Sequence, residues 1–249
     1  MKRIILLVFA GCLLATIPAV ASDTTSVVKQ FMQKVQQAYR SANYLSFHLV
    51  YRYANSDQPT NYIDTMSGEV ALNKNQMRFL IEGVETITND KYTIQVNNGE
   101  KLIYLSTPRS MQMTDPVAML DSTLAHFDGI RTQVIRNKGI VTLDVVFPPG
   151  KSYKHVTMTV DEKTGYFQKI SYDLYTERLV EKDQLMQNGK GGPYQTEGRI
   201  EIVFNQYRQG QFTDELFSEA RYFTRLGQGK YAPTETYKDY QIFLASPKL

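Results

Sequence analysis

The feature that most limits the fold of this chain is a succession of short segments in which residues alternate between two faces, with turn residues between the segments. In the first, Phe47, Leu49, Tyr51 and Tyr53 point one way and their neighbours the other, which is the period of a β-strand. Because the spacing between segments is short, it favours hairpins and predicts an antiparallel meander. Further strands are predicted at 66–72, 77–81, 86–88, 92–96, 102–105, 141–147, 155–160, 167–175 and 198–204.

Two segments have the periodicity of a helix instead. Apolar residues from Val27 to Tyr39 recur at helical spacing with lysine and glutamine between them, so this helix is expected to lie on an apolar surface. Asp115 and Pro116 suit the N-cap and first position of a second helix at 115–127. A last short helix is predicted around 214–222, followed by an extended tail.

The first 21 residues predict a cleavable secretory signal peptide. They contain a basic start, an apolar run from Ile4 to Val20, and the small residues of Ala19-Val20-Ala21 before Ser22. We therefore expect a periplasmic protein with one domain at 22–249.

The single cysteine leaves an alternative open. Ala10-Gly11-Cys12 resembles the end of a bacterial lipobox, in which Cys12 would carry a lipid anchor. Cleavage after Ala21 would instead remove Cys12, and the mature chain would then have no disulfide and no thiolate metal site.

Charge argues against nucleic acid as a partner. The formal net charge of +3 falls to +1 when Lys2 and Arg3 are removed with the signal peptide. Nucleic-acid binding requires a concentrated basic face, which a nearly neutral chain does not provide.

The chain also lacks the patterns expected of an enzyme. Its three histidines, His48, His126 and His155, are far apart in sequence and have no metal-ligand spacing. No Gly-x-Ser-x-Gly sequence is present, and Gly189–Gly192 lacks the spacing of a phosphate-binding loop. We therefore expect no catalytic residue, no metal site and no cofactor.

Several predicted strands carry apolar residues on both faces. Val50 lies between Leu49 and Tyr51, and Leu80 lies between Phe79 and Ile81. A sheet with two apolar faces must cover both, and few helices are predicted to do so. One face could enclose a cavity, which flexible methionines would suit, or the same residues could simply fill a packed core.

The order of elements resembles the periplasmic lipoprotein carrier family of the LolA/LolB type. The features that carry this resemblance are the leading helix and strand, the hairpin Gly68–Phe79, the strand pair beginning at Asn97-Asn98-Gly99, the helix Asp115–Phe127 and the acidic step Asp214–Phe217. The resemblance implies a mainly β fold: an open antiparallel half-barrel with an N-terminal helix and a short helical lid insertion. The chain from about residue 221 onward has no counterpart and would be a C-terminal extension.

The function that this resemblance implies is that of a non-enzymatic carrier or sensor. Its partners would be lipid acyl chains or a lipoprotein, bound in an apolar cavity. Alternation on one face, and the helix expected to cover it, select the candidate cavity residues Phe47, Leu49, Tyr51, Phe79, Ile81, Ile94, Leu102, Tyr104, Leu120 and Phe127. An alternative is a lipid-free module of the cell envelope that binds a protein through its tyrosine-rich C-terminal tail.

Overall fold

The described chain contains one α-helix, fourteen β-strands and several short 3₁₀ turns. The structure is a computed structural model, and it describes residues 24–108, 129–151, 153–180, 185, 191–210, 213–227, 229–246 and 249. The elements are α1 (Thr24–Ser41), β1 (Tyr44–Asn55), β2 (Tyr62–Asn73), β3 (Gln76–Ile81), β4 (Val84–Thr88), β5 (Thr93–Asn97), β6 (Leu102–Ser106), β7 (Arg131–Asn137), β8 (Ile140–Val146), β9 (Tyr153–Asp161), β10 (Phe167–Tyr175), η2 (Thr176–Arg178), β11 (Glu197–Gln209), η3 (Asp214–Phe217), η4 (Glu219–Arg221), β12 (Phe223–Gly227), β13 (Lys230–Pro233), η5 (Glu235–Tyr237) and β14 (Gln241–Leu244).

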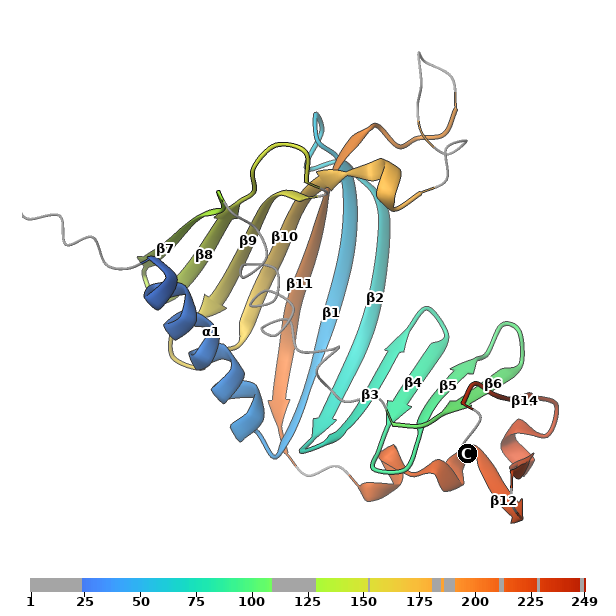
Figure 1. Cartoon of the computed structure of the whole chain (residues 1–249). Helices are drawn as coiled ribbons and strands as arrows, with labels where there is room; N and C mark the ends of the chain where they lie inside the picture. Colours follow the sequence, from blue (N-terminus) through green and yellow to red (C-terminus); the bar gives the residue numbers. More distant parts are fainter. Residues whose placement is uncertain are drawn as a thin grey trace, which may run out of the picture.

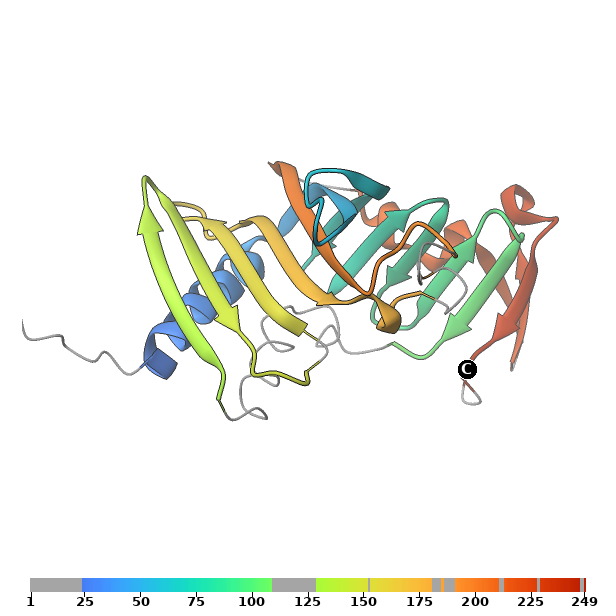
Figure 2. The same ribbon diagram turned by 90° about the horizontal axis from the view of Figure 1, so that it is seen from above.

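Twelve of the strands form one large sheet. Their order is β14-β6-β5-β4-β3-β2-β1-β11-β10-β9-β8-β7, and β12 and β13 form a separate pair. Neighbouring strands in the large sheet are antiparallel, except that β14 runs parallel to β6. Among the described strands, β14 and β7 each pair on one side only, so the sheet is open, as Figures 1 and 2 show from the front and from above. The predicted mainly β, open antiparallel fold with an N-terminal helix is confirmed.

Helix α1 covers one end of the sheet, near β7 to β11 (Figure 1). Its side chains Val28, Phe31, Met32 and Val35 are at most 6% exposed. They pack against strand residues that share one face of the sheet, which we call the helix face. The predicted amphipathic helix is therefore present, with its apolar side turned toward the sheet. Strand residues in this core are Val141, Leu143, Val145, Val156, Met158, Val160, Phe167 and Ile170.

A group of tyrosines holds the end of α1 to the sheet. The hydroxyl groups of Tyr39 and Tyr207 are 2.6 Å apart, and the Tyr207 hydroxyl donates to the carbonyl of Phe167 at 2.8 Å. The ring of Tyr39 meets that of Tyr166 edge-on at 5.3 Å. Burial raises the pKa of Tyr39 to about 12, so its hydroxyl stays neutral and available for these hydrogen bonds.

The C-terminal tail, residues 213–249, covers the other face at the opposite end of the sheet. We call this the tail face. Its strand residues Ile87, Ile94, Ile103 and Leu105 have no exposed surface. They pack against tail residues of which the most buried are Phe217, Tyr222 and Phe223. Two apolar faces were expected from the sequence, and the tail is what covers this one.

One prediction for the tail is wrong, and two further features of the tail were not specified by the sequence. The helix predicted at 214–222 is two short 3₁₀ turns, η3 and η4. Strand β14 joins the sheet beside β6. Tyr231, Tyr237 and Tyr240 are half-buried against the core of the tail face, so the tail is an integral layer of the fold.

Most predicted strands are present, several of them longer than predicted. Strand β7 was missed, because its sequence Arg-Thr-Gln-Val-Ile-Arg-Asn mixes charged and apolar residues on a largely exposed edge. The predicted signal peptide with Cys12 and the helix at 115–127 lie outside the described residues.

Candidate functional site

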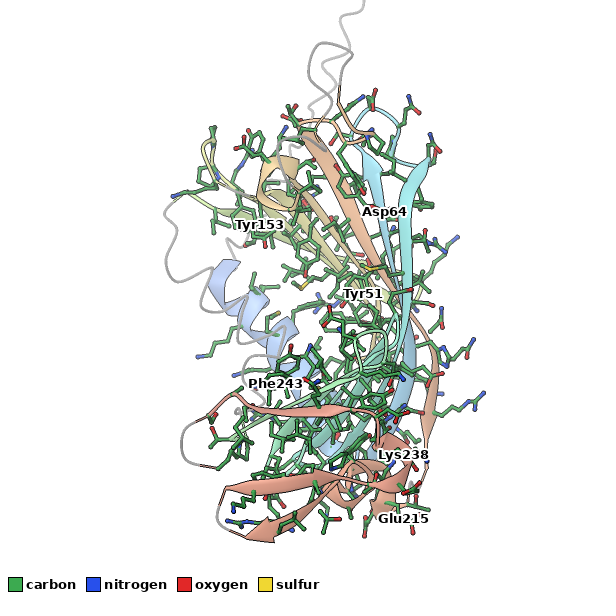
Figure 3. The ribbon with its side chains drawn as sticks, turned by 90° about the vertical axis from the view of Figure 1, so that its right-hand side faces the viewer. Tyr51, Asp64, Tyr153, Glu215, Lys238 and Phe243 are labelled. Atoms are coloured by element: carbon green, nitrogen blue, oxygen red, sulfur yellow. The ribbon has the colours of Figure 1, made fainter. Side chains whose placement is uncertain are left out.

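The helix face continues beyond α1 across β1 to β6 and β14. The strand register places seven of the predicted cavity residues on it: Phe47, Leu49, Tyr51, Phe79, Ile81, Leu102 and Tyr104. Figure 3 shows Tyr51 on the side of the sheet where α1 lies, and Phe243 of β14 on that same side. Alternation therefore identified seven of the ten candidates as side chains that share this face.

These seven residues differ in how far they are covered. Phe47 and Leu49 are 6% and 5% exposed. The centroid of the Phe47 ring lies 5.1 Å from that of Tyr207 and 6.1 Å from that of Tyr39. Phe47 therefore belongs to the core at the end of α1. The other five are half-buried: Tyr51, Phe79, Ile81, Leu102 and Tyr104.

Two further apolar residues on this face are exposed and were not predicted. Met66 of β2 and Phe243 of β14 are each 45% exposed. The Phe243 ring stacks on that of Tyr104, with centroids 5.7 Å apart. Alternation along 66–72 could have indicated Met66, whereas no local pattern relates Phe243 to Tyr104. We call seven of the half-buried and exposed apolar residues on this face the open helix face: Tyr51, Met66, Phe79, Ile81, Leu102, Tyr104 and Phe243.

Ile94 does not belong to this group. The register pairs it with Ile87 and Leu105, and all three lie on the tail face. Ile94 has no exposed surface because the tail covers it. Its assignment to the cavity is therefore wrong. In β5 the odd-numbered residues Thr93 and Gln95 lie on the helix face, and Ile94 points to the other side. The other two candidates, Leu120 and Phe127, lie outside the described residues.

Gly68 gives the open helix face a flat position between Leu49 and Ile81. A Cβ atom at Gly68 would lie 2.8 Å from the carbonyl oxygen of Leu80 and 3.1 Å from Cδ1 of Leu49. Real Cβ atoms do not approach a backbone oxygen so closely, so the strands could not keep this spacing with a larger residue. The glycine thus lets the strands on either side of β2, which carry Leu49 and Ile81, lie close to it.

Charge is sparse on this part of the sheet. The register puts Asp64 of β2 on the helix face beside Tyr53, and its carboxylate accepts a hydrogen bond from the hydroxyl of Tyr194. That hydrogen bond raises the pKa of Tyr194 to about 12. Burial likewise raises the pKa of Tyr51. Both tyrosines are therefore neutral at physiological pH.

A cluster of charged side chains on β8 to β11 lies on the opposite face. His155 Nε2 lies 2.5 Å from Asp144, its Nδ1 lies 3.4 Å from Asp173, and Arg199 makes two hydrogen bonds to Asp173. All four side chains are roughly a quarter to a third exposed. In the part of the chain that the structure describes, no group of three or more His, Cys, Asp or Glu residues could hold a metal ion.

The Arg199–Asp173 pair predicts a dependence of stability on pH. Burial by itself raises the pKa of Asp173, but hydrogen bonds and charge from Arg199 and His155 outweigh it and hold that pKa below its usual value. A lowered pKa contributes stability above the unfolded-state pKa, and the contribution is lost as pH falls through the folded value. Arg199→Gln is therefore expected to lower the melting temperature at pH 7 more than at pH 3. Equal losses at the two pH values would contradict this.

A cleft of about 350 Å³ lies away from the open helix face. It is bordered by the turn between β4 and β5 and by η3 and η4 of the tail. Within it, Lys91 and Glu219 form an ion pair at 2.6 Å. No helix in the described part of the chain is both long enough and apolar enough to span a membrane.

Comparisons with known proteins give remote structural likenesses. No protein-family model matches the sequence, and no curated protein sequence matches it. An uncharacterized conserved protein from Thermus thermophilus is 11% identical over 88% of this chain and 99% of its own, with a TM-score of 0.47. A LolA superfamily protein from Nitrosomonas europaea is 13% identical over 78% and 98%, with a TM-score of 0.34. The lipoprotein LppX from Mycobacterium tuberculosis is 13% identical over 76% and 99%, with a TM-score of 0.37.

At such scores these likenesses identify no residue of the site. The fold rests on the chain's own strands, register and core. The sequence resemblance to the LolA/LolB type agrees with that fold, since the structure has the leading helix and the open antiparallel sheet that this resemblance implies.

Proposed function

We propose that this protein is a non-enzymatic periplasmic carrier or sensor that binds lipid acyl chains, free or attached to a lipoprotein, on the open helix face. The observation that carries the proposal is that large apolar side chains are left half-buried or exposed on the open helix face, with Met66 and Phe243 each 45% exposed. Exposed apolar patches commonly mark binding sites. Here it continues the face that α1 covers farther along the sheet.

Burial of acyl chains supplies enough free energy for such a function without any chemistry. Each methylene group removed from water contributes about 0.8 kcal/mol. Ten to fifteen methylenes therefore contribute on the order of 8 to 12 kcal/mol, before the cost of ordering the chain. The role of the protein would then lie in the control of uptake and release.

Mass spectrometry of the native protein tests the proposal directly. The protein, made with residues 1–21 in place and purified from a periplasmic extract, is expected to show a native mass above that of its polypeptide by one lipid or acylated species. Denaturation should remove the added mass. A polypeptide mass alone in every preparation would contradict the proposal and favour the lipid-free protein-interaction module.

Adjacent residues of β14 provide a matched test of the face. Phe243 and Leu244 are 45% and 46% exposed, and they point to opposite faces of the sheet. Phe243→Glu is expected to weaken binding of a fluorescent fatty acid about tenfold. Covering half of such a side chain contributes on the order of 1 kcal/mol, and a carboxylate placed against an acyl chain adds to the loss. Leu244→Glu should leave binding unchanged.

Met66 provides an independent second position. Met66→Glu should weaken binding as Phe243→Glu does, and Thr65→Glu is its control, because Thr65 is exposed on the opposite face. Thermal unfolding of each variant separates loss of binding from loss of folding. Equal binding by Met66→Glu and Thr65→Glu would place the lipid elsewhere.

A further inference from the structure

One line of side chains crosses the helix face from strand to strand. Each member is paired with the next by the strand register. Because paired residues of neighbouring strands lie about 4.8 Å apart in a sheet, the line from β1 to β14 is about 29 Å long. We call it the cross-strand row: Phe47, Val70, Phe79, Thr86, Gln95, Tyr104 and Phe243.

The cross-strand row is apolar at both ends and polar in the middle. Thr86 of β4 and Gln95 of β5 are paired with each other, between Phe79 on one side and Tyr104 on the other. Thr86 is half-buried and Gln95 is exposed. The row therefore presents an apolar part, a pair of polar side chains and a second apolar part, in that order.

The polar pair has hydrogen-bonding capacity that the fold leaves unused. Among the described residues, neither the Thr86 hydroxyl nor the Gln95 amide has a protein partner. The neighbouring pair on the same two strands differs, since the hydroxyl groups of Thr88 and Thr93 lie 3.3 Å apart and Thr88 is buried. A hydroxyl donates and accepts, and an amide has two donors and an acceptor, so Thr86 and Gln95 can bind an ester, an amide or a hydroxyl.

Both members of this pair are uncharged. An anionic headgroup placed between them would lose water and gain neutral partners only. The register places no lysine or arginine on the helix face of β1 to β6 or of β14, so an anion bound there would find no cationic partner among these strands. The surface therefore complements a neutral polar group better than a phosphate or a carboxylate.

We propose that the ligand is an uncharged amphiphile whose ester, amide or hydroxyl groups lie against Thr86 and Gln95, with apolar parts extending toward Phe79 on one side and toward Tyr104 and Phe243 on the other. This inference rests on the proposed function and deepens it. It predicts that the headgroup, and not only the acyl chain, decides which lipid is bound.

Two lipids that differ only in a phosphate group test the inference. Dioctanoylglycerol and dioctanoyl phosphatidic acid have the same acyl chains, and each is titrated into the protein against a bound neutral fluorescent probe. The wild type is expected to bind dioctanoylglycerol at least about tenfold more tightly. Gln95→Leu should weaken dioctanoylglycerol binding about three- to tenfold, the usual effect of one lost hydrogen bond.

A change of charge at Gln95 gives the sharper result. Gln95→Lys is expected to strengthen binding of dioctanoyl phosphatidic acid about tenfold, because hydrogen bonds to charged groups are stronger than neutral ones. Gln133→Lys is the matched control, since Gln133 is exposed on β7 and its register partner Asp144 lies on the opposite face from α1.

The outcomes separate this inference from the proposed function. Wild-type protein that binds both lipids equally, or prefers phosphatidic acid, would overturn the neutral headgroup and leave the carrier function standing. The neutral headgroup would also be overturned if Gln95→Lys and Gln133→Lys changed the affinity for dioctanoyl phosphatidic acid by the same factor. Binding of neither lipid, together with a native mass free of lipid, would overturn both.

Discussion

Replacement of Phe217 by alanine is expected to lower the free energy of unfolding by about 3 to 5 kcal/mol, the usual cost of removing a buried phenylalanine ring. Phe217 ends η3 in the tail and is 1% exposed. It belongs to the same core as Ile87 and Ile94 of the sheet. Its carbonyl oxygen also accepts a hydrogen bond of 3.0 Å from Asn89, so the backbone beside the cavity is held in place and cannot readily collapse into it.

Chemical denaturation followed by circular dichroism measures this effect. Leu226→Ala is the control in the same tail, and a change within about 0.5 kcal/mol is expected there because Leu226 is 67% exposed. Unchanged stability of Phe217→Ala would mean that the tail is not part of the folded core. Deletion of residues 229–249 would likewise remove side chains that pack against the tail face. A loss of function in such a deletion variant would therefore not show that the tail binds a partner.

The tail shows where sequence reasoning reached its limit. The apolar character of both faces was visible in the strands. On the tail face it correctly indicated that another layer would cover the sheet. What covers the tail face is a set of short turns and strands whose contacts are long-range, such as the pairing of Gln241 with Leu102. Periodicity reports only local contacts, so no pattern within 213–249 could identify its partner strands.

The site shows a second limit, which is register. Within a strand, alternation placed Phe79 with Ile81 and Leu102 with Tyr104 correctly. Between strands, the turn decides which parity faces the same side, and a shift by one residue moves every side chain to the other face. Ile94 was assigned to the wrong face for this reason. The pairing of Thr86 with Gln95 likewise emerges only once the register of β4 and β5 is known.

Gly198→Ala is expected to be as damaging as the loss of a buried aromatic ring. The ring and hydroxyl of Tyr53 lie directly over Gly198, so close that a Cβ atom there would overlap them. Tyr53 is 8% exposed, and its hydroxyl is 2.6 Å from the fully buried Thr176 hydroxyl. Since the ring is fixed at its far end by this hydrogen bond, it cannot move aside without breaking it. We expect a loss of about 3 kcal/mol, at the upper end of the usual cost of overpacking.

The cause can be isolated with a double mutant. In a Tyr53→Ala background the overlap is gone, so Gly198→Ala should then cost less than about 1 kcal/mol, and the two substitutions should be strongly non-additive. Gly99→Ala is the matched control, because a Cβ atom at Gly99 would meet Asn97 Oδ1 at an ordinary 3.5 Å. If Gly198→Ala costs the same in both backgrounds, the damage arises from the β11 backbone itself and not from the Tyr53 ring. The expected rescue would show instead that Gly198 provides the space in which Tyr53 joins β1 to η2.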